Sequence, residues 1–163
     1  MKVSVDIKGQ KQLKRKMEQI TRRFARTGTV KVGFFPNSTY PPRKGSSEPL
    51  YVAQVAAWQE YGTHDANGKQ HIPPRPFMRT MARTYSPRWG ALLASALQVT
   101  ELDSEKALGI VAEKLKDQMV ETIVKFDTPP NADATIEKKG FDDPLIDSGH
   151  MMRSVEAKVE MKQ

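Results

Sequence analysis

Hydrophobic and polar residues alternate one by one at three places along the chain. These stretches are residues 2–8, 29–35 and 155–161, and in each of them every second residue is apolar. This two-residue period is typical of a strand that buries one face and exposes the other. We therefore expect three strands, one near each end of the chain and one after the first helical segment.

Four other segments repeat their apolar residues every three or four positions, which is typical of helices that bury one face. They are residues 10–27, 50–61, 77–98 and 103–126. Gly28 is well placed to cap the first helix. The apolar face of this helix consists of Leu13, Met17, Ile20 and Phe24, and the basic residues that point the other way are Lys11, Lys14, Arg15, Arg22 and Arg26.

The helix predicted at 77–98 contains Ser86 and Pro87 near its middle. A proline inside a helix removes one hydrogen bond and crowds the preceding turn, which costs ~3 kcal/mol or more. The helix could bend there, or a new helix could start with Ser86 as its cap. The apolar face keeps its phase across the interruption, which favours a bend.

The helix predicted at 103–126, with Asp103 or Ser104 as its cap, has two apolar sides. The main stripe consists of Leu108, Val111, Ala112, Leu115, Met119, Thr122 and Ile123. A weaker stripe of Ile110, Val120 and Val124 lies roughly opposite. A helix that is apolar on two sides is either deeply buried or meets a neighbouring subunit, and the sequence leaves both open.

Three long segments, 36–49, 62–76 and 127–146, show neither period and are predicted as loops. The middle one begins after an aromatic residue and ends in three prolines around Arg75, so its ends have restricted backbone geometry while 65–70 is polar and loose. The whole pattern predicts one α+β domain, 1–163. It would have a small, mainly antiparallel sheet packed against two or three helices.

The net charge of +7 over 163 residues is concentrated at the start of the chain. Residues 1–31 hold ten Lys or Arg and two acidic residues, a net +8, whereas the remainder holds sixteen basic and seventeen acidic residues, a net −1. There is no cysteine, which excludes disulfides and thiolate metal sites and is typical of intracellular assembly. No run of about 18 apolar residues occurs, so we expect neither membrane insertion nor export.

Residues with catalytic potential are few. His64, Asp65 and His71 share one predicted loop, but their spacing matches no metal-binding pattern, and exposed loop residues are the simpler interpretation. Beside Pro144 and Ser148, the acidic residues Asp142, Asp143 and Asp147 are best interpreted as turn and cap residues. No glycine-rich phosphate loop is present. We therefore expect no enzymatic activity, no metal and no cofactor.

The basic face of the first helix could neutralise nucleic-acid phosphates. It carries no aromatic residue that could stack on bases, and no helix-turn-helix follows it. A solvated face, or one that docks on an acidic protein, is the favoured interpretation, and direct nucleic-acid binding is the alternative.

Several short motifs occur in the same order as in a known group of proteins. They are Val52-Ala53 to Trp58-Gln59-Glu60-Tyr61-Gly62-Thr63, Ile72-Pro73-Pro74-Arg75-Pro76-Phe77-Met78-Arg79, Ala134-Thr135-Ile136 to Lys139-Gly140, and Pro144-Leu145-Ile146-Asp147-Ser148-Gly149 with Met152-Arg153-Ser154-Val155. With the strand-helix-strand start, the chain resembles tailed-phage neck proteins, the tail-completion or head-tail joining proteins also described as virion morphogenesis or minor tail components.

This resemblance implies a small α+β virion protein that forms a ring, expected to be a hexamer, in the neck or tail and is assembled in the host cytoplasm. Its partners would be head connector and tail tube proteins, with phage DNA passing through the ring without sequence-specific binding. We expect subunit or partner contacts at Tyr61, Gly62, Thr63, Arg75, Phe77, Arg79, Ile110, Val120 and Val124. A basic nucleic-acid-binding accessory protein is the alternative, and a hydrolase ranks third.

Overall fold

The computed structural model of the protein describes residues 9–42, 45 and 48–162. The strand predicted at 2–8 lies outside the described residues. The elements are α1 (Gln10–Phe24), β1 (Gly28–Gly33), α2 (Val52–Tyr61), β2 (Thr63–His64), β3 (Gln70–Ile72), α3 (Phe77–Val99), α4 (Ser104–Val124), α5 (Asp133–Lys139), α6 (His150–Arg153) and β4 (Glu156–Met161). Helices and antiparallel strands together confirm the predicted α+β class.

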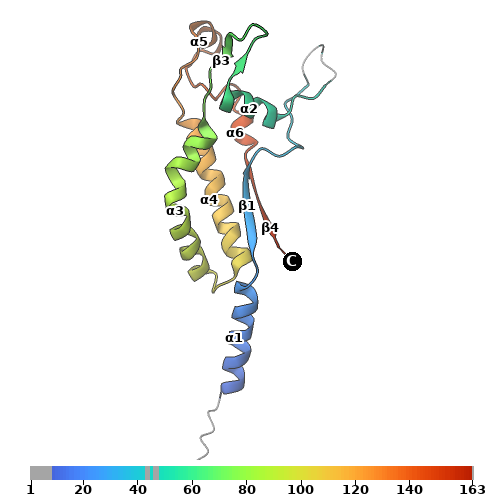
Figure 1. The fold of residues 1–163 in the computed structure, drawn as a ribbon, viewed down its shortest axis with the longest axis vertical. Helices are drawn as coiled ribbons and strands as arrows, with labels where there is room; N and C mark the ends of the chain where they lie inside the picture. The colour runs from blue at the N-terminus through green and yellow to red at the C-terminus, as the bar shows by residue number, and fades with distance from the viewer. Residues whose placement is uncertain (1–8, 43–44, 46–47, 163) are drawn as a thin grey trace, which may run out of the picture.

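Helix α4 is the centre of the body, because it packs on α3 along one side and on the sheet of β1 and β4 along another (Figure 1). Leu115, Met119 and Ile123 are buried in the resulting core. Trp89 Nε1 of α3 donates a hydrogen bond of 2.9 Å to Gln118 Oε1 of α4, which joins the two helices through their side chains. Burial within the subunit thus accounts for most of the apolar surface on α4.

The weaker stripe of α4 consists of Ile110, Val120 and Val124, and the sequence leaves open whether it is buried or meets a neighbouring subunit. In the structure the three residues do not share one environment. Val120 is half-buried and packs on the core, so it belongs to the interior. Ile110 and Val124 are exposed. Only these two remain available to another molecule.

Strands β1 and β4 are far apart in sequence and pair antiparallel, with Val30 opposite Val159 and Val32 opposite Ala157. Val30 and Val32 pack on the core. Gly28 lets β1 approach α4 closely, because a Cβ there would lie 2.7 Å from Leu108 Cδ1. Among the described residues each strand has one partner strand, so each has one unpaired edge.

The predictions for α1 and α3 need two corrections at specific residues. Helix α1 ends at Phe24 rather than Thr27, and Gly28 starts β1 instead of capping the helix. Helix α3 continues through Pro87 to Val99, so a separate helix starting at Ser86 is wrong. The apolar residues of α3 keep their phase on both sides of Pro87 and pack on one core, which favours a single helix.

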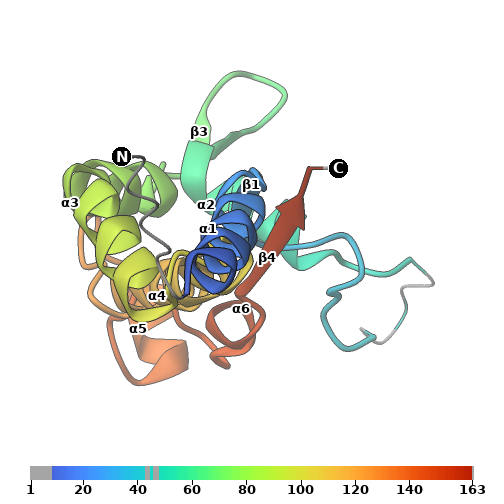
Figure 2. The same ribbon diagram turned by 90° about the horizontal axis from the view of Figure 1, so that it is seen from below.

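Two of the predicted loops contain regular structure. The 62–76 segment forms the antiparallel hairpin of β2 and β3, which extends from the body on a different side from the segment after β1 (Figure 2). Asp65 Oδ1 accepts hydrogen bonds of 2.9 Å from the backbone N–H groups of Asn67 and Lys69, so the middle of this segment is an ordered turn. The 127–146 segment contains α5.

Leu115 lies in the middle of the buried side of α4, and we predict that Leu115→Ala lowers the free energy of unfolding by about 2–5 kcal/mol. Val99→Ala, at the exposed end of α3, is the control and should change it by less than about 0.5 kcal/mol. Urea unfolding followed by circular dichroism measures both. Equal effects of the two substitutions would show that the core is placed wrongly.

Candidate assembly interface

The buried carboxylate of Glu60 caps the start of α3. Its side chain is 2% exposed. Oε2 accepts from the backbone N–H of Met78 at 2.8 Å, and Oε1 accepts from the N–H and Nε of Arg79 at 3.3 and 2.8 Å. A negative charge at a helix N-terminus is stabilised by the unpaired N–H groups and the helix dipole. Glu60 therefore fixes α2 to α3, a role that the sequence analysis missed.

Arg75 joins α2 to the 129–131 segment. Its guanidinium donates to Gln59 Oε1 at 2.9 Å and to the carbonyl oxygens of Pro129 and Pro130 at 3.3 and 3.2 Å. It also donates to Asn131 Oδ1 at 3.4 Å. Burial lowers the pKa of Arg75, and the nearby Asp142 carboxylate opposes that change. All of these hydrogen-bond acceptors are uncharged, so Arg75 has no ion pair with a carboxylate among the described residues.

Arg75 and Phe77 were predicted to contact a partner, but they are 6% and 0% exposed. In the folded subunit they therefore offer no surface to a partner. The proline-rich end of the segment directs both side chains into the body, where Phe77 packs edge-on against Phe34 at 6.3 Å between ring centres. Their effect on assembly would act through the fold of the subunit.

Of the other predicted contact residues in and around the hairpin, Tyr61 and Arg79 lie at the surface. The Arg79 guanidinium lies 5.2 Å from the centre of the Tyr61 ring, within the range of a cation–π contact. Gly62 has φ +75° and a Cβ there would lie 2.7 Å from the carbonyl oxygen of Ile72, so both conformation and space require glycine. Thr63 is half-buried in β2. Gly62 thus shapes the hairpin, while Tyr61 and Arg79 remain available for contacts.

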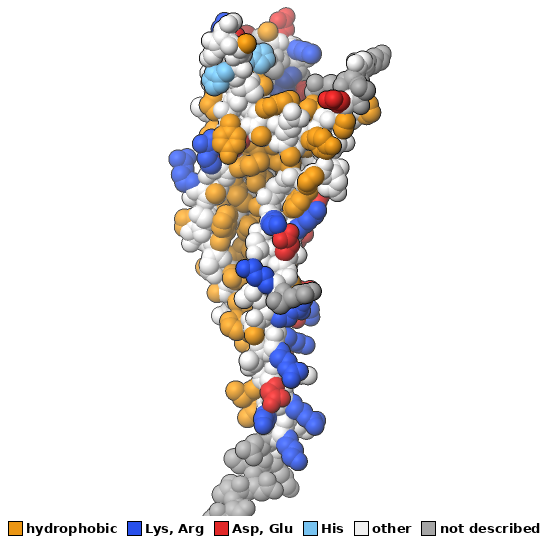
Figure 3. All heavy atoms as spheres, turned by 45° about the vertical axis from the view of Figure 1, so that its right-hand side comes forward, with side chains coloured by type: hydrophobic (Ala, Val, Ile, Leu, Met, Phe, Trp, Pro, Cys, Tyr) orange, Lys and Arg blue, Asp and Glu red, His pale blue; other side chains and the backbone are white. Residues whose placement is uncertain are grey.

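Helix α1 projects from the body, and its apolar face, which consists of Leu13, Met17, Ile20 and Phe24, is largely bare. Leu13, Met17 and Phe24 are 61%, 60% and 55% exposed. In the lower part of Figure 3, hydrophobic side chains follow one side of this projection and Lys and Arg side chains follow the other. An isolated helix of this length is marginal in water and gains most of its stability from packing. Within the described residues, the apolar face has no such packing.

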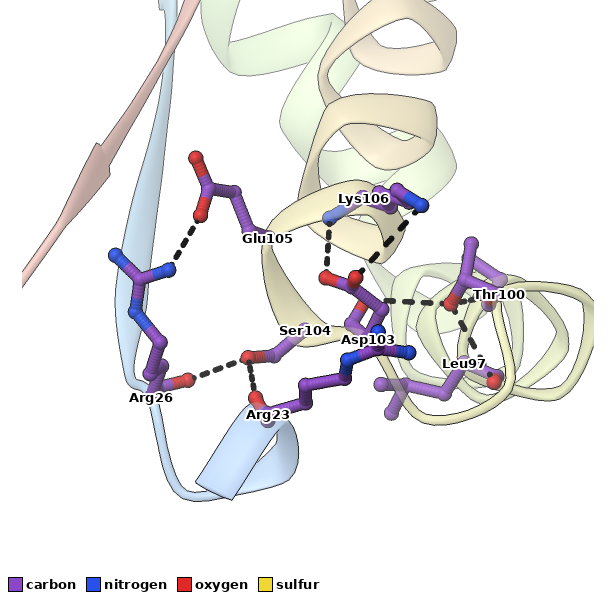
Figure 4. Close-up of polar contacts among 9 residues, drawn as sticks. Arg23, Arg26, Leu97, Thr100, Asp103, Ser104, Glu105 and Lys106 are labelled. Carbon is purple, nitrogen blue, oxygen red and sulfur yellow. Dashed lines mark hydrogen bonds and ion pairs between the residues drawn. The ribbon is translucent and has the colours of Figure 1, made fainter. Parts of the chain in front are cut away.

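The C-terminal end of α1 is held on the N-terminus of α4 (Figure 4). Ser104 Oγ lies 2.6 Å from the carbonyl oxygen of Arg23 and 2.7 Å from that of Arg26, and its single proton is shared between them. Arg26 also forms an ion pair of 2.6 Å with Glu105. Arg26 therefore belongs to this junction, while Lys11, Arg15 and Arg22 are exposed along the basic face.

The turn between α3 and α4 lies next to the same junction. Glu101 and Leu102 both have positive φ, 51° and 63°, a conformation that costs of order 1–3 kcal/mol for each non-glycine residue. The Thr100 hydroxyl donates to the carbonyl of Ala96 at 2.8 Å. Asp103 Oδ1 accepts from the N–H of Lys106 at 3.3 Å (Figure 4). These contacts hold the turn that leads into Ser104, the residue that binds the end of α1.

The histidines and aspartates considered as metal ligands or as a catalytic carboxylate cluster do not form a metal site in the part of the chain that the structure describes. No group of three or more potential ligands is found there. His64 and His71 are exposed on the hairpin, and Asp65 forms its turn. Asp142 Oδ1 accepts from the N–H of Asn131 at 2.9 Å, and the Asp143 carbonyl accepts from Lys139 Nζ at 2.8 Å.

A cleft of about 780 Å³ lies between α2, the hairpin and the 131–151 region, and Asp147, Ser148 and His150 line it. These are the residue types of a hydrolytic triad. However, His150 Nε2 lies 3.0 Å from the Thr39 carbonyl oxygen, and Ser148 Oγ accepts from the backbone N–H of His150 at 3.4 Å. The serine hydroxyl and the imidazole are therefore not hydrogen-bonded to each other as a nucleophile and its base.

No family model, no curated protein and no solved structure matches the chain. Among the described helices, none has both the length and the apolar character that crossing a membrane requires.

We predict that Glu60→Ala lowers the free energy of unfolding by about 1–3 kcal/mol, because it leaves buried N–H groups at the start of α3 without an acceptor. Glu137→Ala, on the exposed surface of α5, is the matched control and should have little effect. Thermal unfolding of both variants measures the difference. A melting temperature of Glu60→Ala equal to that of the control would contradict the role assigned to this carboxylate.

Proposed function

We propose that the protein is a structural virion subunit of a tailed phage, a tail-completion or head-tail joining protein that assembles into a ring in the neck. The proposal covers terminator, joining protein and minor tail component alike. Its partners would be further copies of the chain in a hexamer, head connector proteins and tail tube proteins. DNA would pass through the ring without sequence-specific contacts, and the protein would have no enzymatic activity.

The observation that carries this proposal is the bare apolar face of α1. Full burial of a side chain such as Leu or Met contributes about 1.5–3 kcal/mol, and at Leu13, Met17 and Phe24 most of that gain is not realised in the isolated subunit. A bare apolar stripe on a projecting helix marks an interaction site. A subunit that completes its packing only on association fits a protein whose function is assembly.

The positions of the family-like motifs support the same proposal. Residues from the Trp58–Thr63 and Ile72–Arg79 motifs meet through the hydrogen bonds of Glu60 with Met78 and Arg79 and of Arg75 with Gln59. These hydrogen bonds join two motifs that are separate in sequence. The fold therefore gives a reason why both motifs occur in one chain.

A nucleic-acid-binding accessory protein is the second candidate. The exposed basic face of α1, with Lys11, Arg15 and Arg22, favours it. Phosphate contacts would occupy these cations but leave the apolar face on the other side of α1 uncovered. The neck protein accounts for the exposed apolar face of the helix and is preferred for that reason.

We predict that Leu13→Gln with Met17→Gln abolishes ring formation while the body stays folded, because these side chains project from it. Gln12→Ala with Gln19→Ala, elsewhere on the same helix, is the control. Light scattering during size exclusion should give about six monomer masses for wild type and control, and a monomer for the apolar variant. Circular dichroism checks the fold.

Two results would contradict the proposal. One is a wild-type chain that stays monomeric at every concentration and shows no ring in negative-stain images. The other is a monomer that binds DNA tightly and sequence-selectively, which would favour the second candidate.

A further inference from the structure

The outward face of α4, which points away from the core, carries a line of acidic residues with an apolar residue at each end, and Lys114 borders this line. Its residues follow one another at intervals of three or four, so they form one line along the helix. All of them are exposed except Glu121, which is half-buried. They are Ile110, Glu113, Asp117, Glu121 and Val124.

Two of the three acidic residues on this face have no partner within the described part of the subunit. Glu121 is engaged, since Lys125 Nζ lies 2.6 Å from its Oε1 and the Tyr85 hydroxyl also bonds it. These two contacts lower the pKa of Glu121. Glu113 and Asp117 make no hydrogen bond or ion pair there, so their carboxylates are free to meet a cation from another molecule.

The apolar face of α1 has the complementary pattern. At 100° per residue, Lys14 borders it on one side, and Lys16 and Arg23 border it on the other. If α1 packs on another molecule through its apolar face, these cations therefore lie along both sides of the contact. The lengths also agree, because α1 has 15 residues, about 22 Å, and the stripe from Ile110 to Val124 is about 21 Å long.

Helix α1 does not reach the outward face of its own α4. The junction at Ser104 and Glu105 holds its C-terminal end at the N-terminus of α4, and from there α1 extends away from the body (Figure 1). The stripe begins at Ile110 and runs in the opposite direction. A contact between the two surfaces therefore requires a second copy of the chain.

We propose that α1 of one subunit lies along the outward face of α4 in the neighbouring subunit, an inference that rests on the proposed ring function. The apolar face covers Ile110 and Val124, and Lys14, Lys16 or Arg23 meets Glu113 and Asp117. The contact joins two different surfaces, so it repeats head to tail and closes into a ring when the rotation allows. Every subunit then gives one helix and receives one.

A second copy fits α1 better than the other possible occupants. Nucleic acid would pair with the cations and leave Leu13, Met17 and Phe24 exposed. An anionic membrane surface could cover both kinds of residue, but it would leave the acidic stripe unused. Of these three occupants, another copy of this chain is the one that supplies apolar and acidic groups in a line of matching length.

Charge reversal on each side tests the contact. Glu113→Lys with Asp117→Lys forms one variant, Lys14→Glu with Lys16→Glu forms a second, and the four substitutions together form a third. We expect each of the first two to raise the dissociation constant of the assembly at least about tenfold at low salt, because like charges then face each other. The third should recover much of the wild-type assembly. Asp133→Lys with Glu137→Lys on exposed α5 is the charge-matched control.

The outcomes separate this inference from the proposed function. If wild type forms a ring and the reversals leave it unchanged, or if the combined variant shows no recovery, the inference is wrong and the ring function stands. If wild type forms no ring, both fail. Binding to phosphatidylserine vesicles that depends on α1 and not on Glu113 and Asp117 would assign the apolar face to a membrane and overturn the inference.

Discussion

The structure depends on the burial of α4 from two directions. The sheet of β1 and β4 has only two strands within the described residues, and neither it nor α3 forms a core without the helix between them. Two-stranded sheets are marginal in water and need packing against a helix. Because α4 supplies that packing on one side and contacts α3 on the other, its sequence is constrained along most of its circumference. The outward stripe from Ile110 to Val124 is the side that this constraint leaves free.

The same helix determines where α1 lies. Ser104, its first residue, holds the last carbonyl groups of the α1 region, and Glu105 pairs with Arg26. These polar contacts are local to one end, so they fix the attachment of α1 without covering its apolar face. The free energy that this face can gain by burial is left for association, which links the packing of the subunit to its proposed role in a ring.

The long periodic elements are predictable from the sequence because each has a continuous apolar stripe. Helix α4 and strand β4 lie close to the predicted ranges, and α3 follows its apolar phase through Pro87. The hairpin was missed because strands of two and three residues are too short to show a period, although Asn67-Gly68 is a recognised hairpin turn signal. Helix α5 was also missed, although Asp133 in its first turn and Gly140 after its end are helix boundary signals.

The roles of the site residues are harder to predict, because they depend on contacts between segments that are far apart in the sequence. Arg75 was singled out by the prolines around it, but its acceptors include carbonyl oxygens of Pro129 and Pro130, which no pattern in the sequence distinguishes. Burial of Glu60 likewise depends on how α2 meets α3. In contrast, the amphipathic character of α1 was evident from spacing alone. Only the structure shows that its apolar face lies outside the core.

The proposed ring requires that the apolar face of α1, which is exposed in the subunit, becomes covered on assembly. The chain has no cysteine, so Met17→Cys introduces a single thiol on that face, and Gln19→Cys places one on another side of α1. The measurement is the rate at which a thiol reagent labels each variant as protein concentration rises. We expect the labelling of Met17→Cys to become at least about tenfold slower on assembly, while the labelling of Gln19→Cys stays nearly constant. Equal rates for Met17→Cys in dilute and concentrated protein would contradict this expectation.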